Sequence, residues 1–216
     1  MSRVLLSVPT FESVTPDTFK ALWDMDRGGN EVAFECIRGY DCANARNKAA
    51  QLALDGGFDY LMMVDSDVTV PPDALVNLMG HGAKVAMGFY AHRGDQQREY
   101  RGMTCACRLL DESGAPYFGY PLESEYSVEE LRAMRGRGEH AVAIHGGGMG
   151  CVLIDVRVFH ELRYPWFYWL NHANDEQSVL SEDLYFCEGC RNEGIPIVLD
   201  TRVACGHLFR HVQQST

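Results

Sequence analysis

The sequence of 216 residues contains no apolar stretch that approaches the ~20 residues of a membrane-spanning helix. The apolar segment at residues 4–8 is too short for a signal peptide and ends at Pro9 and Thr10, as a strand would. Internal repeats and low-complexity segments are also missing. We therefore expect a cytoplasmic protein with no integral membrane segment.

Positive charge is scarce, because 19 lysine and arginine residues stand against 30 aspartate and glutamate residues and leave a formal net charge of -11. Such an acidic chain argues against nucleic acid or an anionic membrane as the partner. The glycine run at residues 146–150 contains neither GxGxxG nor GxxxxGK. Dinucleotide binding and P-loop chemistry are therefore disfavoured.

A disulfide framework is not expected either. The 8 cysteines occur in a chain without an export signal, which predicts free thiols in a reducing compartment. Cys187 and Cys190 form an isolated CxxC, and the tighter pair Cys105 and Cys107 does not complete a zinc-finger spacing. We expect packed thiols rather than a structural zinc site.

The composition favours one domain, because a chain with 46% hydrophobic residues and no break in composition can bury a single large core. Strand and helix patterns alternate up to Tyr90 and predict an α/β fold with a mostly parallel sheet, followed by a small antiparallel extension. The predicted strands are at 4–8, 32–36, 60–64, 85–90, 101–110, 116–120, 142–144, 151–154 and 196–199, and the predicted helices are at 16–24, 43–55, 73–79, 128–134, 156–162 and 181–192.

The most informative segment is the apolar run at residues 60–64, which is followed at once by Asp65-Ser66-Asp67. Side chains at i and i+2 share one face of an extended chain, so both carboxylates can reach one hard cation. Oxygen ligands favour Mg²⁺ or Mn²⁺ over zinc, and open parallel sheets bind ligands at the carboxyl ends of their strands. The alternative is that these acids cap the next helix, although Asp73 is already placed in its first turn.

Several short motifs stand in a specific order along the chain: Pro9-Thr10, Ala45-Arg46-Asn47, Asp65-Ser66-Asp67, Gly148-Met149-Gly150, Pro165-Trp166-Phe167, Ser181-Glu182-Asp183 and Gly206-His207. Together they resemble glycosyltransferases of the GT-A fold, especially the small family 2-like enzymes of bacteria and phages. The resemblance covers nearly the whole chain. It implies a Rossmann-like central sheet with helices on both faces, a nucleotide-sugar-binding part at about residues 1–100 and an acceptor-binding part at about 101–216.

The resemblance also implies a metal site. In that family the DxD carboxylates hold Mn²⁺ or Mg²⁺ against the two phosphates of a nucleotide-sugar, and here Asp65 and Asp67 match those positions. A histidine near the chain end often completes the metal shell, and His207 is placed for it. The alternative for His207 is an ordinary histidine near the end of the chain.

Asp183 matches the family's catalytic base, which removes the proton of the acceptor hydroxyl, and Glu182 is the neighbour that shapes the site. The same residues, preceded by Ser181, would also stabilise the start of a helix without any catalytic role. The residues alone leave these two interpretations open, and the resemblance favours the base.

The resemblance assigns the other positions to two groups, one that binds the nucleotide and one that binds a sugar. In the first group, Arg46 either contacts the diphosphate or supports the DxD loop. In the second, the aromatic segment near Trp166 either stacks on a sugar or packs against the sheet. Asp41 is a weaker candidate for a contact with the base. The nucleotide group is Pro9, Thr10, Arg46, Asn47 and Ser66, and the group for the donor or acceptor sugar is Gly147, Gly148, Trp166 and Phe167.

The sequence thus predicts a metal-dependent glycosyltransferase. It would move a sugar from a nucleoside-diphosphate donor, UDP by default, to a carbohydrate or other hydroxyl acceptor, with inversion. One alternative is nucleotidyl transfer, which would need further acidic ligands or a lysine loop that grips phosphate. Another is a non-catalytic module that binds sugar nucleotides.

Overall fold

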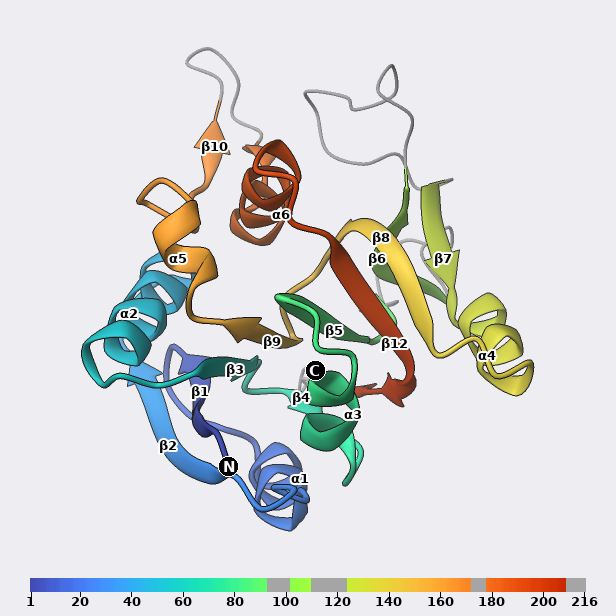
Figure 1. The fold of residues 1–216 in the computed structure, drawn as a ribbon, viewed down its shortest axis with the longest axis horizontal. Helices are drawn as coiled ribbons and strands as arrows, with labels where there is room; N and C mark the ends of the chain where they lie inside the picture. The colour runs from blue at the N-terminus through green and yellow to red at the C-terminus, as the bar shows by residue number, and fades with distance from the viewer. Residues whose placement is uncertain (93–101, 110–123, 172–177, 209–216) are drawn as a thin grey trace, which may run out of the picture.

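The computed structural model describes residues 1–92, 102–109, 124–171 and 178–208. None of the described helices is long and apolar enough to cross a membrane. The elements in chain order (Figure 1) are β1 (Arg3–Thr10), α1 (Pro16–Asp24), β2 (Glu31–Arg38), α2 (Cys42–Asp55), β3 (Tyr60–Val64), β4 (Val68–Thr69), α3 (Ala74–Gly80), β5 (Val85–Phe89), β6 (Met103–Arg108), β7 (Glu125–Ser127), α4 (Val128–Gly136), β8 (Ala141–Gly147), β9 (Cys151–Asp155), α5 (Val158–Glu161), β10 (Leu170–Asn171), β11 (Ser178–Leu180), α6 (Glu182–Asn192), β12 (Ile197–Ala204) and β13 (Gly206–His207).

Nine of the described strands form one mixed sheet in the order β2-β1-β3-β9-β5-β12-β8-β6-β7, and the short strands form two separate pairs, β10 with β11 and β13 with β4. β1 is parallel to β2 and β3, and β5 is parallel to β12, whereas all other neighbours in this sheet are antiparallel. The α/β class is therefore confirmed, but the mostly parallel sheet is not. The reason is that β9 enters between β3 and β5 against their direction, where simple β/α alternation predicts parallel neighbours.

Helices cover both faces of this sheet, as predicted. Successive side chains of β3 alternate between two apolar cores. Leu61 and Met63 lie in the core that α2, α5 and α6 cover, whereas Met62 and Val64 lie in the core that α1 and α3 cover. All four side chains are fully buried, and each contributes about 1.5–3 kcal/mol relative to exposure. β3 is thus held rigidly just before the DxD motif.

Most predicted elements occur within one to three residues of their expected bounds. Thr15 caps α1 by accepting a hydrogen bond from the backbone N–H of Thr18. β3 has the predicted bounds. The predicted strand at 116–120 lies outside the described residues, and the short strands β4, β7, β10, β11 and β13 were not predicted.

All cysteines are free thiols, as predicted. Cys187 and Cys190 are buried in α6, and the Cys187 thiol donates a hydrogen bond to the carbonyl of Gly147. Burial raises the pKa of both thiols above the ordinary value, so they stay protonated at neutral pH. The CxxC pair therefore serves the packing of α6 on β8.

Gly88 in β5 marks a position where the sheet leaves no room for a side chain. A Cβ there would lie 2.7 Å from Cγ1 of Val203 and 2.8 Å from its carbonyl oxygen. Because the backbone of β12 cannot yield easily, we expect Gly88→Ala to lower the free energy of unfolding by about 1–3 kcal/mol in urea titrations.

Gly136→Ala is the matched control, since a Cβ at this last residue of α4 meets nothing within 4 Å. Its stability should equal or slightly exceed that of the wild type. A Gly88→Ala variant as stable as the wild type would contradict the close packing of β5 and β12.

Candidate functional site

The DxD motif lies at the carboxyl end of β3, where the neighbouring strand β1 also ends. The backbone N–H of Asp65 donates to the carbonyl of Gly150 (3.1 Å), and the N–H of Val68 donates back to the carbonyl of Asp65 (3.1 Å). The carbonyl of Ser66 accepts from the N–H of Thr15 (2.9 Å). These bonds fix the loop, and neither acid caps α3, whose N-cap residue is Asp73.

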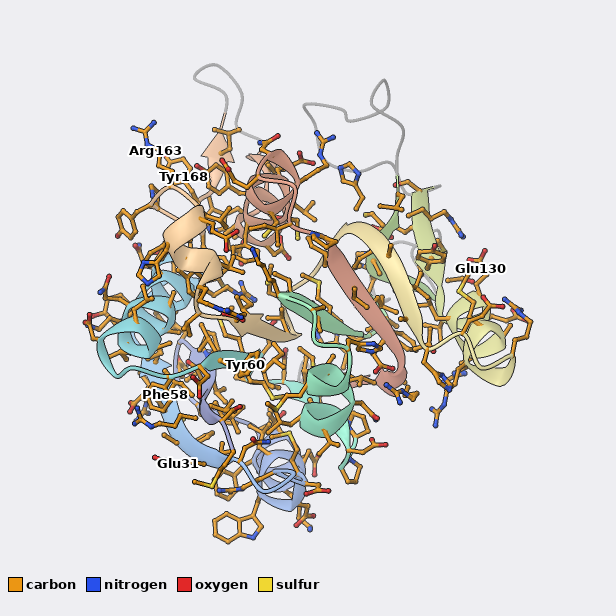
Figure 2. All side chains as sticks on the ribbon, in the orientation of Figure 1. Glu31, Phe58, Tyr60, Glu130, Arg163 and Tyr168 are labelled. Carbon is orange, nitrogen blue, oxygen red and sulfur yellow. The ribbon has the colours of Figure 1, made fainter. Side chains whose placement is uncertain are left out.

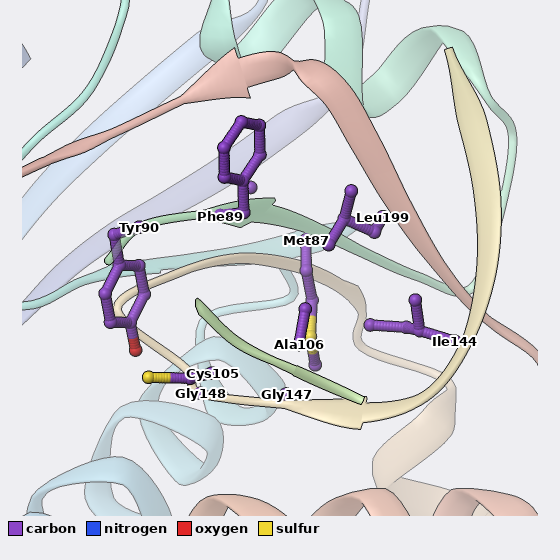
Figure 3. A pocket seen from close by; sticks show the side chains of 10 residues that line it. Met87, Phe89, Tyr90, Cys105, Ala106, Ile144, Gly147, Gly148 and Leu199 are labelled. Carbon is purple, nitrogen blue, oxygen red and sulfur yellow. The ribbon is translucent and has the colours of Figure 1, made fainter. Parts of the chain in front are cut away.

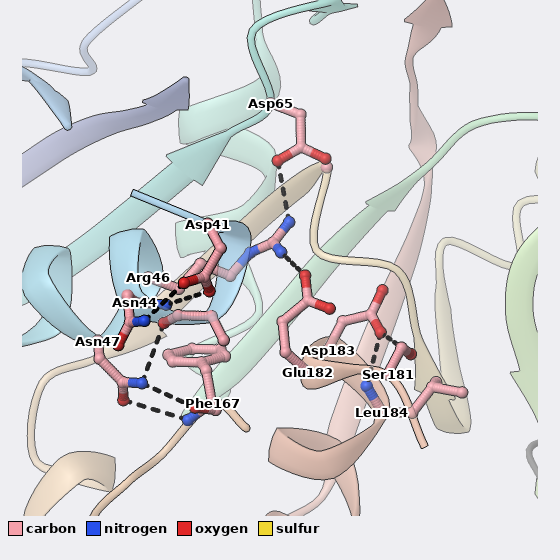
Figure 4. A network of polar contacts seen from close by, with 12 residues as sticks. Asp41, Asn44, Arg46, Asn47, Asp65, Phe167, Ser181, Glu182, Asp183 and Leu184 are labelled. Carbon is pink, nitrogen blue, oxygen red and sulfur yellow. Dashed lines mark hydrogen bonds and ion pairs between the residues drawn. The ribbon is translucent and has the colours of Figure 1, made fainter. Parts of the chain in front are cut away.

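Arg46 of α2 connects this loop to the start of α6 (Figure 4). Its Nη2 donates to Oδ1 of Asp65 at 2.9 Å, and its Nη1 forms a short ion pair with Oε1 of Glu182. The Arg46 side chain is only 4% exposed. Burial opposes its charge, but Asp65 and Glu182 outweigh burial and hold the pKa of the guanidinium above its ordinary value.

Glu182 is also buried, with a side chain 6% exposed. Burial raises its pKa to about 7, although the Arg46 guanidinium opposes this shift, and the neighbouring Asp183 adds to it. Its carboxylate is turned to Arg46. Glu182 therefore holds Arg46 in place.

Asp183 is half-buried in the first turn of α6. Its Oδ1 accepts a short hydrogen bond from the Ser181 hydroxyl and a second bond from the backbone N–H of Leu184 at 2.8 Å. Both bonds hold Oδ1 at the N-terminal end of α6. Asp183 thus also stabilises the start of α6, which was the alternative interpretation. The same bonds to Oδ1 fix the orientation of its second oxygen, Oδ2.

His207 reaches the DxD motif through a pairing of two short strands. β13 pairs antiparallel with β4, so that His207 lies opposite Val68, and the N–H of Leu208 donates to the carbonyl of Asp67 at 2.9 Å. The Nε2 atom of His207 lies 3.9 Å from Oδ2 of Asp67. His207 therefore lies beside the second acid of the motif.

The orientation of the His207 ring suits a metal ligand. Its Nδ1 lies 2.9 Å from the carbonyl oxygen of Ala91, and because a carbonyl only accepts, Nδ1 carries the hydrogen. In the neutral ring Nε2 then bears the lone pair and is turned towards Asp67. The Tyr90 ring packs edge-on against His207 with centroids 5.2 Å apart. Histidines that bind metals are commonly fixed by such a bond from the other nitrogen.

The side-chain atoms near the DxD motif suit Mg²⁺ or Mn²⁺ in part. Among the residues that the structure describes, no three His, Cys, Asp or Glu side chains are arranged to hold an ion by themselves. Asp67 and His207 offer one oxygen and one nitrogen, and Asp65 offers a carboxylate that is anchored on Arg46. Ions that act on phosphates are often bound by only one or two protein ligands, and Asp67 and His207 would supply that number.

Three aromatic and polar predictions are corrected. Asn47 is buried and uses both ends of its amide within the protein: Nδ2 donates to the carbonyls of Ala43 and Phe167, and Oδ1 accepts from the N–H groups of Trp166 and Phe167. Trp166 and Phe167 are 6% and 1% exposed. Asn47 therefore anchors the aromatic segment, and the rings of Trp166 and Phe167 belong to the core, not to a sugar site.

The glycine predictions are corrected in the same way. A Cβ on Gly148 would lie 2.2 Å from the Tyr90 hydroxyl oxygen, and one on Gly147 would lie 3.2 Å from the carbonyl of Cys105. These glycines allow the chain to cross close to Tyr90 and β6. The cavity beside them is about 10 Å³ (Figure 3), which suffices for about one water and not for a sugar.

Pro9, Thr10 and Asp41, which the sequence analysis associates with the nucleotide, lie at the end of β1 and at the start of α2. Pro9 and Thr10 are buried at the end of β1, where the Thr10 hydroxyl donates to the carbonyl of Ser13 at 2.8 Å. Asp41 caps α2 by accepting from the N–H of Asn44 at 3.0 Å, and this bond lowers the pKa of its carboxyl. Asp41 is therefore a helix cap rather than a contact for a nucleotide base.

Sequence reasoning missed a group of polar side chains that the strands around Tyr90 bring together. The Tyr90 hydroxyl accepts from the N–H of Gly150 at 3.0 Å. His92 lies 3.5 Å from the Cys105 sulfur through Nδ1 and 2.8 Å from Glu125 through Nε2. No sequence motif marks these residues, because β5, β6 and β7 bring them together from distant positions.

Comparison with known proteins gives evidence about the fold. No family model matches the chain, and no curated protein matches it. The chain is similar to the crystal structure of A197 from STIV, with 17% sequence identity and a TM-score of 0.61 over 96% of this chain and 86% of that chain. It is also similar to GalNAc-T7 with UDP, GalNAc and Mn²⁺, with 11% identity and a TM-score of 0.60 over 97% of this chain and 44% of that chain. These likenesses support a GT-A-like fold.

The buried Glu182 makes stability depend on pH. Its pKa of about 7 lies above the ordinary 4.5, so its contribution to stability is complete below about pH 4.5 and is lost as the pH rises towards 7. Glu182→Gln lacks this loss. We therefore compare the free energies of unfolding of the variant and the wild type by urea titration at about pH 5 and at about pH 8. The difference, variant minus wild type, should rise by about 2–3 kcal/mol from the lower to the higher pH. A difference that does not change with pH would contradict the burial of an ionisable Glu182.

Proposed function

We propose that this chain is a metal-dependent glycosyltransferase that moves a sugar from a nucleoside diphosphate, UDP by default, to a hydroxyl acceptor with inversion. The observation that carries the proposal is the juxtaposition of Asp67 and His207 through the β4 and β13 pair, with the histidine ring oriented by the Ala91 carbonyl. The fold it shares with GalNAc-T7, whose structure holds UDP, GalNAc and Mn²⁺, agrees with this chemistry.

Asp67 and His207 would hold Mn²⁺ or Mg²⁺ at the edge of the sheet. When bound, the cation would neutralise the charge of the departing nucleoside diphosphate. Arg46 would brace the site, because both of its Nη atoms are already engaged, one by Asp65 and one by Glu182. Of the two predicted roles for Arg46, this geometry favours support of the DxD loop over direct contact with the phosphates.

The nucleoside would lie over the ends of β1 and β2. Backbone groups of Pro9, Thr10 and Ser66 would border it. Phe11 and Tyr40, which follow those strands, are 75% and 49% exposed and could stack on a base. We also propose that the protein acts in the cytoplasm.

Asp183 would accept the proton of the acceptor hydroxyl. Its Oδ1 is held by Ser181 and by the N–H of Leu184, so the transfer would fall to Oδ2. A base that acts directly on the attacking hydroxyl corresponds to a single displacement, which inverts the configuration at the sugar. Glu182 is unsuited to this task because Arg46 holds it in the interior.

The metal site can be tested without turnover. For the wild type we expect UDP to raise the Tm only when Mn²⁺ is present, because binding stabilises the folded state by mass action. Asp67→Ala and His207→Ala should each weaken Mn²⁺-dependent UDP binding by about 10–100-fold in calorimetry. His160→Ala, which alters an exposed histidine of α5, is the control and should bind normally. Normal binding by both site variants would refute the assigned ligands.

The base can be separated from binding. Asp183→Asn should retain Mn²⁺-dependent UDP binding but lose about 10²–10⁴-fold in the rate of sugar transfer. Glu193→Gln, at the other end of α6, is the matched control and should keep the wild-type rate. If Asp183→Asn transfers sugar at the wild-type rate, another group is the base.

A further inference from the structure

The chain between α5 and α6 divides its aromatic residues between the core and the surface. Asn47 holds the backbone of Trp166 and Phe167, whose rings are buried, and Phe167 stacks on Phe186 of α6. The next two rings face outwards: Tyr168 is 49% exposed and Trp169 is 39% exposed. Figure 2 shows Tyr168 on the segment between α5 and β10. Two large rings are thus presented to solvent by a firmly anchored backbone.

Strand pairing brings these rings to the start of α6. Leu170 of β10 lies opposite Leu180 of β11, and Leu180 directly precedes Ser181. Trp169 precedes Leu170 and Ser181 follows Leu180, so both residues leave the antiparallel pair at the same end, and the Ser181 hydroxyl donates to Asp183. On the other side, the Tyr168 ring packs edge-on against Tyr185 of α6 with centroids 5.8 Å apart. The exposed rings therefore lie at the end of α6 that carries Asp183.

We propose that Trp169, supported by Tyr168 and Tyr185, is the platform on which a neutral pyranose acceptor stacks, with one hydroxyl directed at Asp183. This proposal rests on the proposed function. A pyranose offers an apolar C–H face for the ring and a polar edge for the carboxylate, and binding sites combine such apolar walls with a few polar groups.

The charge around the platform favours a neutral acceptor over an anionic one. Four carboxylates lie in this part of the molecule, namely Asp65, Asp67, Glu182 and Asp183. Within the described residues Arg46 pairs with two of them, Asp65 and Glu182, and its guanidinium is buried between these two and turned away from solvent. An acidic sugar or a phosphorylated acceptor would be repelled, so the platform suits an uncharged oligosaccharide.

Tryptophan fluorescence gives a direct test, because the chain has 3 tryptophans. Trp23 is 71% exposed on α1, and Trp166 is 6% exposed. In a Trp23→Phe background Trp169 is the remaining exposed tryptophan. We expect neutral tetrasaccharides of glucose, galactose or N-acetylglucosamine, added with UDP and Mn²⁺, to change its emission saturably.

Further substitution of Trp169→Ala should abolish the change in emission and weaken sugar binding in calorimetry by at least about tenfold. Tyr164→Ala, which alters a side chain that is 63% exposed in the same segment, is the control and should leave the emission change and the sugar binding intact.

Two results would overturn the platform. One is an emission that no sugar of the panel alters although UDP and Mn²⁺ bind, which would leave the proposed function standing. The other is a change caused by phosphatidylcholine vesicles or by sulfated tetrasaccharides but not by neutral ones. If UDP and Mn²⁺ fail to bind at all, the proposed function fails instead, and sugar binding that persists in the metal-free protein would still support the platform.

Discussion

The buried guanidinium of Arg46 is the interaction on which the rest of the site depends. It joins three segments that are far apart in sequence: α2, the loop after β3 and the start of α6. A charge in the interior is tolerated only when opposite charges surround it, and removal of one partner of such a pair commonly destabilises a protein by about 3–5 kcal/mol. Asp65 and Glu182 are therefore fixed in position by the same group, and Asp183 follows because it is the next residue of α6.

A second constraint acts at the end of the chain. After β12, the backbone returns to the DxD loop and pairs with β4, which places His207 beside Asp67. Tyr90 supports both sides of this arrangement, since its ring packs on His207 and its hydroxyl accepts from Gly150, whose carbonyl in turn holds Asp65. The glycine run is needed for this crossing because side chains at Gly148 and Gly150 would collide with Tyr90. The geometry of the site is thus a consequence of backbone pairing and close packing.

Patterns within short segments predicted much of the fold and part of the site. The apolar run of β3 and the two acids after it were evident, because burial and charge change within a single residue. The partners of Arg46 were not, since Glu182 is 136 positions away in sequence and no local pattern reports such a contact. Composition likewise could not tell that Trp166 and Phe167 are buried while Tyr168 and Trp169 are exposed, because Asn47 of α2 decides which rings face inwards. The antiparallel entry of β9 was missed for a similar reason: alternation of strands and helices predicts parallel neighbours, and no local pattern shows that β9 enters between β3 and β5 in the opposite direction.

The central claim is that Asp67 and His207 meet at one cation that also touches a pyrophosphate. Anomalous diffraction from crystals grown with UDP and Mn²⁺ tests it most directly. The account predicts a single manganese peak bonded to Oδ of Asp67, to Nε2 of His207 and to oxygens of both phosphates, at about 2.0–2.3 Å. Manganese and UDP bound elsewhere on the protein, or UDP bound at this edge without manganese, would contradict it.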